Sequence, residues 1–313
     1  KKIFDGQSDY IRLSGISDTG RSLENLILNK ISLNSKNLEY YFIVKQGSQS
    51  GCDKLTKVHI NKFNLNKDLK LNDGIFVFDL TNDRDLNIIK TFNINEKKYL
   101  RDFYKNSDIQ KFKTNMEAKK KLLYLTWDDN IENLPNIKSH LKRFEKILKT
   151  RLKTYNENYP WFSLHRPRDT NIFLNSKIVV PYRSKLNTFG YNNIEWFCRS
   201  DCYVIVKKKD DISLKTLLAV LNSKLFYMWL FFKGKRKGNI LELFGTPLSE
   251  LPLKIMDNEI CIKLEALIDK IFYSDLNVIS ELANKIDKII YKYYELNDKE
   301  IDFVENFYNE KTN

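Results

Sequence analysis

The chain has 313 residues, 42% of them hydrophobic, so it can bury a sizeable core and makes more than one mean-sized domain but fewer than three. Its 53 Lys and Arg residues exceed its 40 Asp and Glu residues, and the net charge of +13 favours a polyanionic partner, either nucleic acid or an anionic membrane surface. Aromatic residues make up 13% of the chain, which excludes wholesale disorder.

The cysteines and the apolar runs bear on the compartment. The four cysteines form no CxxC pair, which indicates neither a disulfide framework nor a zinc ribbon and predicts a reduced, cytoplasmic setting. The chain opens at Lys1 without a methionine, as a piece of a longer protein would, and no signal peptide is expected. The apolar run 214–232 is interrupted at Asn222-Ser223-Lys224 and falls short of the ~20 residues of a membrane span, so we expect a buried helix and no membrane partner.

Hydrophobic periodicity predicts the elements in chain order. A short helix is expected at 21–30 and a clearer one at Asn136–Lys153, with an apolar stripe and basic outer faces. Aromatic and β-branched runs predict strands at 39–44, 74–80, 121–127, 178–180, 196–197 and 203–206. Helices are expected at 214–232, 259–272, 278–295 and 299–308. Strands first and helices last predict an α+β fold: a mixed sheet with a helical C-terminal part.

The common motifs of catalysis are absent from the sequence. There is no GxGxxG or GxxxxGK[ST] phosphate loop and no HExxH, and the three histidines show no metal-ligand spacing. We therefore expect no catalytic residue, metal site or cofactor site in this chain. The alternative is a nuclease or other enzyme whose metal site uses scattered acids such as Asp128, Asp129 and Glu132.

Three segments combine cations with aromatic residues or glycines. The first, Pro160–Arg168, brings Trp161 and His165 together with Arg166 and Arg168. Arginine forks grip phosphates or pair with guanine, and aromatic rings stack on bases. The alternative is a proline-bounded loop with a buried tryptophan and ordinary surface arginines.

The other two segments follow a predicted strand and a predicted helix. Pro181–Phe189 offers Arg183, Lys185 and Asn187 for contacts with the DNA backbone and base edges, unless it is a hairpin with a solvated tip. In Lys233–Gly238, glycines would let phosphate approach closely, unless the cations form a solvated charge run. The cations expected to contact DNA there are Lys233, Lys235, Arg236 and Lys237.

An ordered series of short blocks opens with Gln46-Gly47-Ser48-Gln49-Ser50-Gly51-Cys52-Asp53-Lys54. The later blocks are Tyr99–Phe103, Ser107–Ile109, Pro160–Arg168, Lys177–Arg183, Asp201–Ile205, Leu217–Phe232 with Lys235–Gly238, and Pro247–Pro252. In this order they resemble the TaqI-like C-terminal specificity domain, the target-recognition part of adenine-specific DNA methyltransferases and type IIG restriction-modification enzymes. Ser50 stands where the family more often has threonine, which keeps the hydroxyl.

The resemblance implies a prokaryotic, sequence-specific reader of double-stranded DNA with further contacts at Gln46, Ser48, Ser50 and Lys54. It divides the chain into a lead-in or linker (1–39), the recognition domain (40–255) and a helical packing segment (256–313). The family's S-adenosylmethionine loop and Asn-Pro-Pro-Tyr motif are absent here. We therefore expect the methyltransferase domain, with S-adenosylmethionine, to be a partner in the same or a separate polypeptide. A non-catalytic RNA-binding or assembly subunit is the other alternative.

Overall fold

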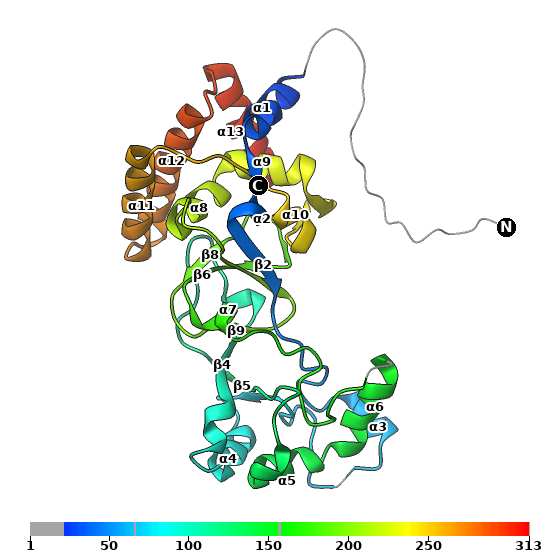
Figure 1. Ribbon diagram of the computed structural model, residues 1–313. Helices are drawn as coiled ribbons and strands as arrows, with labels where there is room; N and C mark the ends of the chain where they lie inside the picture. The colour runs from blue at the N-terminus through cyan, green and yellow to red at the C-terminus, as the bar shows by residue number, and fades with distance from the viewer. Residues whose placement is uncertain (1–21, 66, 156–157, 313) are drawn as a thin grey trace, which may run out of the picture.

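The computed structural model describes residues 22–65, 67–155 and 158–312 and places a mainly helical part above a central sheet and a second part below it (Figure 1). The helices are α1 (Leu23–Ser32), α2 (Leu38–Tyr41), α3 (Lys57–Lys62), α4 (Asp83–Thr91), α5 (Pro135–Lys142), α6 (Glu145–Tyr155), α7 (Asn171–Leu174), α8 (Leu214–Leu221), α9 (Lys224–Lys233), α10 (Gly245–Ser249), α11 (Asn258–Phe272), α12 (Leu276–Tyr293) and α13 (Asp298–Thr312). The strands are β1 (Lys36–Asn37), β2 (Phe42–Gln46), β3 (Val77–Asp79), β4 (Leu100–Tyr104), β5 (Lys120–Leu123), β6 (Lys177–Pro181), β7 (Arg183–Ser184), β8 (Gly190–Asn192), β9 (Phe197–Cys198), β10 (Cys202–Lys207), β11 (Lys235–Lys237), β12 (Ile240–Glu242) and β13 (Pro252–Leu253). The α+β class with a helical C-terminal part is confirmed.

The central sheet, in the order β2-β10-β6-β8, is antiparallel and separates two hydrophobic cores. Strand β6 is buried along its whole length. Ile178 and Val180 belong to the upper core, and Val179 between them belongs to the lower core. Successive side chains of a strand point to opposite faces, so the unbroken apolar run at 178–180 requires a core on each side of the sheet.

The lower part holds the second sheet, in the order β3-β5-β4-β9, with α5 and α6 contributing to the same core. The single helix expected over Asn136–Lys153 is wrong at its middle, because α5 ends at Lys142 and α6 begins at Glu145. Arg143 N bonds to His140 O and Phe144 N to Leu141 O. These bonds to the third residue back tighten the chain into a 3-10 turn.

Two other predicted elements are also divided. The strand expected at 39–44 begins with the helical turn α2, and β2 starts only at Phe42. The apolar helix expected at 214–232 is two helices, α8 and α9. Ser223 caps α9 by accepting from Phe226 N (3.2 Å), while the Asn222 side chain exchanges two hydrogen bonds with the backbone of Phe189. The polar residues of the interruption therefore end one helix and begin the next.

The N-terminal and C-terminal segments share the upper core. Helix α1 buries Ile27, Leu28 and Ile31 in the same cluster as residues of α11, α12 and α13. Lys30 donates to Glu300 at 2.7 Å, and β1 pairs with β13. Division of the chain after residue 39 and after residue 255 stays a prediction. Residues 1–21 of the expected lead-in lie outside the described residues.

Candidate nucleic-acid interface

Strand β2 ends in the turn 46–50, which lies against the turn between β9 and β10. Gly47 N donates to Cys202 O at 2.9 Å. A Cβ atom on Gly47 would lie 2.2 Å from the carbonyl oxygen of Arg199, so the close approach of the two turns requires glycine. The turn therefore has a defined position at the C-terminal end of β2, packed against residues 198–202.

The hydroxyl groups of this turn do not face outward. Ser48 and Ser50 are buried, and Ser50 Oγ donates to the carboxylate of Asp53. The expected DNA contacts through these two side chains are therefore corrected: both side chains lie inside the protein, and Ser50 Oγ also accepts from Cys52 N at 3.1 Å. Lys54 is exposed, but it pairs through its backbone with Gly74 in the lower part.

Arg151 is buried and holds this turn to the segment 160–165. Its guanidinium donates to the carbonyls of Ser50, Trp161 (3.0 Å) and Ser163 (2.8 Å). Sequence reasoning placed this arginine among the cations of a solvated helix face. The spacing of polar residues along the helix does not distinguish the buried Arg151 from the exposed cations beside it.

Arg168 and Gln46, two predicted contact residues, lie together at the end of β2. Arg168 Nη2 donates to Gln46 Oε1 at 3.2 Å, and Arg168 Nε donates to Gly47 O at 3.3 Å. Gln46 Nε2 in turn donates to Ser200 O at 2.7 Å. Partial burial lowers the pKa of the Arg168 guanidinium, which nevertheless stays protonated at neutral pH. The pair forms a fixed hydrogen-bonding group at the edge of the sheet.

Two further arginines flank the same turn. Arg166 pairs through its backbone with Gln49 and is half-buried. The side chain of Arg199 is 54% exposed and lies 3.6 Å from Asp53. Sequence reasoning missed Arg199, although it lies two residues after the strand predicted at 196–197.

Three aromatic rings from separate segments meet beside the Arg168–Gln46 pair. The rings of Tyr182 and Tyr203 are 6.4 Å apart, and those of Tyr182 and Phe244 are 5.4 Å apart. Tyr203 is the cross-strand partner of Gln46. We call this surface the aromatic–basic face and define it by Gln46, Arg168, Tyr182, Arg183, Tyr203, Lys235 and Phe244.

The three-stranded sheet β11-β12-β7 supplies two further cations of the aromatic–basic face, Arg183 and Lys235. Arg183 lies 5.1 Å from the ring centroid of Tyr182 and donates twice to Glu242. Lys235 Nζ lies 5.0 Å from the ring centroid of Phe244. Sequence reasoning named both cations but not the aromatic residues, which only the fold brings together.

Two predicted residues are interior and are corrected. Asn187 is fully buried, and its Nδ2 donates to Leu221 O (2.7 Å) and Ser223 O (2.8 Å), so this amide is not presented to a base. His165 is also buried, with Nδ1 3.0 Å from the hydroxyl of Tyr159. Both side chains hold turns together inside the protein.

The lysine-rich segment Lys233–Gly238 forms regular secondary structure. Its cations belong to the C-terminus of α9 and to β11. Arg236 folds back over the ring of Phe231 (4.3 Å) and donates to its carbonyl at 3.1 Å. Lys233 and Lys237 are exposed. Lys185, the predicted contact residue of the segment Pro181–Phe189, donates to Thr312 O at the end of α13.

Two of the three acids named for the enzyme alternative, Asp129 and Glu132, make local hydrogen bonds or ion pairs. Asp129 accepts from the backbone and the hydroxyl of Thr126, and Glu132 pairs with Lys138. Across the part of the chain that the structure describes, no group of three or more His, Cys, Asp or Glu side chains could hold a metal ion.

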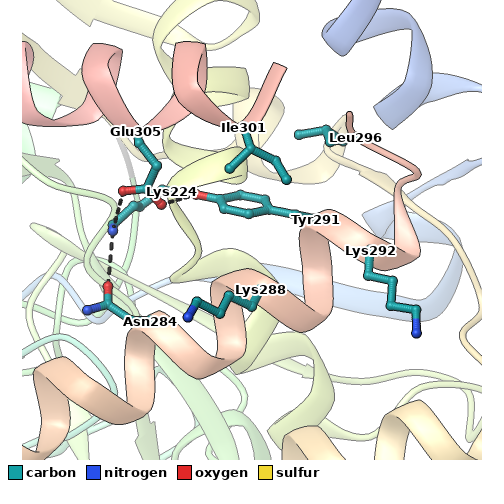
Figure 2. A pocket seen from close by; sticks show the side chains of 8 residues that line it. All are labelled: Lys224, Asn284, Lys288, Tyr291, Lys292, Leu296, Ile301 and Glu305. Atoms are coloured by element: carbon teal, nitrogen blue, oxygen red, sulfur yellow. Dashed lines mark hydrogen bonds and ion pairs between the residues drawn. The ribbon is translucent and has the colours of Figure 1, made fainter. Parts of the chain in front are cut away.

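A groove of about 600 Å³ lies between α12 and α13 (Figure 2). Lys224 and Tyr291 converge on the carboxylate of Glu305 at 2.7 and 2.8 Å, and Lys224 also donates to Asn284. Burial raises the pKa of the neighbouring Asp287 to about 6. This network ties α13 to α9 and leaves no unpaired group among those named here.

Within residues 22–65, 67–155 and 158–312, no helix has the length and apolar content needed to cross a bilayer.

The fold and the aromatic–basic face define an α+β domain with a structured cationic surface. The model of the TaqI-like C-terminal specificity domain matches residues 86–253, which is more than half of the chain. The chain therefore belongs to the family of TaqI-like C-terminal specificity domains.

Similar proteins include two curated methyltransferases and one solved structure. The type II methyltransferase M.HincII of Haemophilus influenzae is 29% identical over 146 residues, 42% of this chain and 29% of its own length. M.HindII of Haemophilus influenzae strain Rd is 28% identical over 138 residues, 42% of this chain and 26% of its own. The type IIL restriction-modification enzyme MmeI, solved in complex with DNA, has a similar fold with a TM-score of 0.54 at 13% identity, over 86% of this chain and 35% of that one.

Proposed function

We propose that this chain reads a short site in double-stranded DNA and presents the target adenine to a methyltransferase domain. It would serve an adenine-specific (N6) methyltransferase or a restriction-modification enzyme. The observation that carries the proposal is the aromatic–basic face. There the Tyr182 ring packs with the rings of Tyr203 and Phe244, Arg183 lies over Tyr182, and Arg168 donates to Gln46, the cross-strand partner of Tyr203. Family membership supports this assignment.

The chemistry of the face fits duplex DNA. Arginine forks pair with guanine edges in the major groove and with phosphates, while lysines at its margin contact phosphates without reading sequence. The net charge of +13 adds a long-range attraction for polyanions.

The catalytic step is proposed for a partner domain, which would bind S-adenosylmethionine and flip the adenine out of the duplex. The chain spans less than a third of the length of the two curated relatives it matches, which supports a partner of substantial size. The four free cysteines fit a reduced prokaryotic cytoplasm.

Selection from a library of randomised DNA duplexes tests the proposal. We expect the wild-type chain to return a short motif and the Arg168→Ala, Arg183→Ala double variant to lose it. Substitution of the exposed Lys142 and Lys146 on the lower helices is the control for charge and should preserve the motif. Recovery of no motif, or stronger binding of an RNA duplex of equal length, would overturn the proposal.

A further inference from the structure

Arg183 and Glu242 form a pair in which a buried carboxylate holds an exposed cation. The two residues are opposite each other on the antiparallel strands β7 and β12. Arg183 Nε and Nη2 donate to the same oxygen, Glu242 Oε1, at 3.0 and 2.8 Å. The Glu242 side chain is 9% exposed and that of Arg183 is 56% exposed.

The surroundings of Glu242 make it a firm support. Strand β12 is the middle strand of its sheet, and the preceding Leu241 is fully buried in the upper core. The guanidinium of Arg183 also lies over the ring of Tyr182. Two hydrogen bonds on one edge and a ring on one face restrict the guanidinium to one plane.

The outer edge of the guanidinium faces away from this support. Glu242 uses two of the five N–H groups of an arginine, and the other three belong to Nη1 and Nη2. Two N–H groups at this end match the O6 and N7 acceptors of guanine. We propose that Arg183 reads a guanine in the major groove and that Glu242 is its positioning residue, an inference that rests on the proposed DNA recognition.

An arginine that only binds phosphate would behave in the opposite way. Removal of Glu242 raises the net charge by one, so a phosphate-binding Arg183 should then hold every DNA sequence more tightly. An arginine whose plane must be fixed should instead lose about tenfold to hundredfold of its preference at one base pair. The sign of the change therefore distinguishes the two roles.

The experiment selects motifs from randomised duplexes and then titrates the selected duplex and a scrambled one. We expect Glu242→Ala and Arg183→Lys to lose preference at the same base pair while affinity for the scrambled duplex stays equal or rises. Glu242→Gln keeps an acceptor oxygen and should lose less. Arg183→Lys leaves Glu242 in place and decides the question if Glu242→Ala unfolds.

Asp73→Asn is the matched control. Asp73 is buried and accepts from Nε and Nη2 of the exposed Arg84, the same kind of pair away from the aromatic–basic face. This variant should return the wild-type motif. The positioning role is wrong if Glu242→Ala and Arg183→Lys keep the full stringency of the motif, or if Glu242→Ala binds all duplexes more tightly without losing preference. Failure of the wild-type chain to select any motif would instead reject DNA recognition itself.

Discussion

Arg151 shapes a surface that its own side chain does not reach. It lies beneath the turn 46–50 and satisfies three backbone carbonyls of two different segments. Buried carbonyls left without a donor cost free energy, and a charged donor makes each such bond stronger than a neutral one. The position of Gln46, and with it Arg168, therefore depends on a residue in the interior.

We predict that Arg151→Leu lowers the free energy of unfolding by about 3 kcal/mol and weakens binding of the selected duplex. Urea denaturation and DNA titration measure the two effects. Lys146→Met on the same helix changes an exposed cation and should alter the free energy of unfolding by less than about 0.5 kcal/mol. Equal stability of the Arg151 variant and wild type would contradict this role.

His140 is a buried residue with a predictable response to pH. It packs among Phe78, Phe92 and Phe144, its Nε2 lies 3.0 Å from Ile75 O, and burial lowers its pKa to about 4. The unfolded chain, with an ordinary histidine pKa near 6.5, takes up a proton at a higher pH than the folded chain does. The stabilisation is thus complete above pH ~6.5 and is lost as the pH falls toward 4.

We predict that His140 makes the free energy of unfolding fall by about 2–3 kcal/mol between pH 7 and pH 4.5. Urea denaturation at both values, for wild type and for His140→Phe, measures this contribution as a difference. The variant should lose less stability on acidification than wild type does. An identical loss in both proteins would show that other groups cause the acid sensitivity.

At the scale of elements, strand β11 and the end of α9 give the cations of Lys233–Gly238 defined positions. Lys235 and Lys237 belong to the strand, Lys233 ends α9, and Arg236 is committed to the helix end through Phe231. Lysines that contact phosphates position the protein on the DNA without choosing a sequence.

Neutralising Lys233, Lys235 and Lys237 together should weaken binding of all duplexes by a similar factor. The slope of log K against log salt should become shallower by up to about 0.9 for each phosphate that the variant no longer neutralises. Affinity measured from 50 to 300 mM salt (roughly the range where such slopes are read) gives the value. Replacement of Arg236 alone is the comparison and should mainly reduce stability. An unchanged slope would mean that these lysines do not contact DNA.

Elements with one uninterrupted hydrophobic pattern were predictable from the sequence. Helices that are divided in the middle, such as α5 and α6, were not. Strands β6 and β10 and helices α11, α12 and α13 correspond to the patterns that predicted them. No proline or glycine marks the break between α5 and α6, and the same apolar stripe continues across both helices. The sequence pattern therefore predicted one helix where the structure has two. Asn187 illustrates the limit for the site: a turn asparagine can contact a base or bond backbone elsewhere in the protein, and only the fold shows that it bonds Leu221 and Ser223.

For the whole molecule, the prediction concerns catalysis. The sequence contains neither an Asn-Pro-Pro-Tyr motif nor a glycine-rich cofactor loop. We expect the isolated chain to transfer no label from labelled S-adenosylmethionine to a mixture of DNA duplexes. A known adenine methyltransferase in the same assay is the positive control, and robust transfer by this chain would contradict the proposed division of labour.

The sequence by itself determined the α+β class, the family and the excess of cations, since these depend on composition, local periodicity and the order of short blocks. Only the tertiary structure decided which cations are available. Hydrogen bonding and burial depend on residues far apart in the chain: Arg151 and Asn187 lie inside, while Arg183 is held outward by Glu242, 59 residues away. The central sheet between two cores fixes these positions, because its strands bring distant turns to one edge.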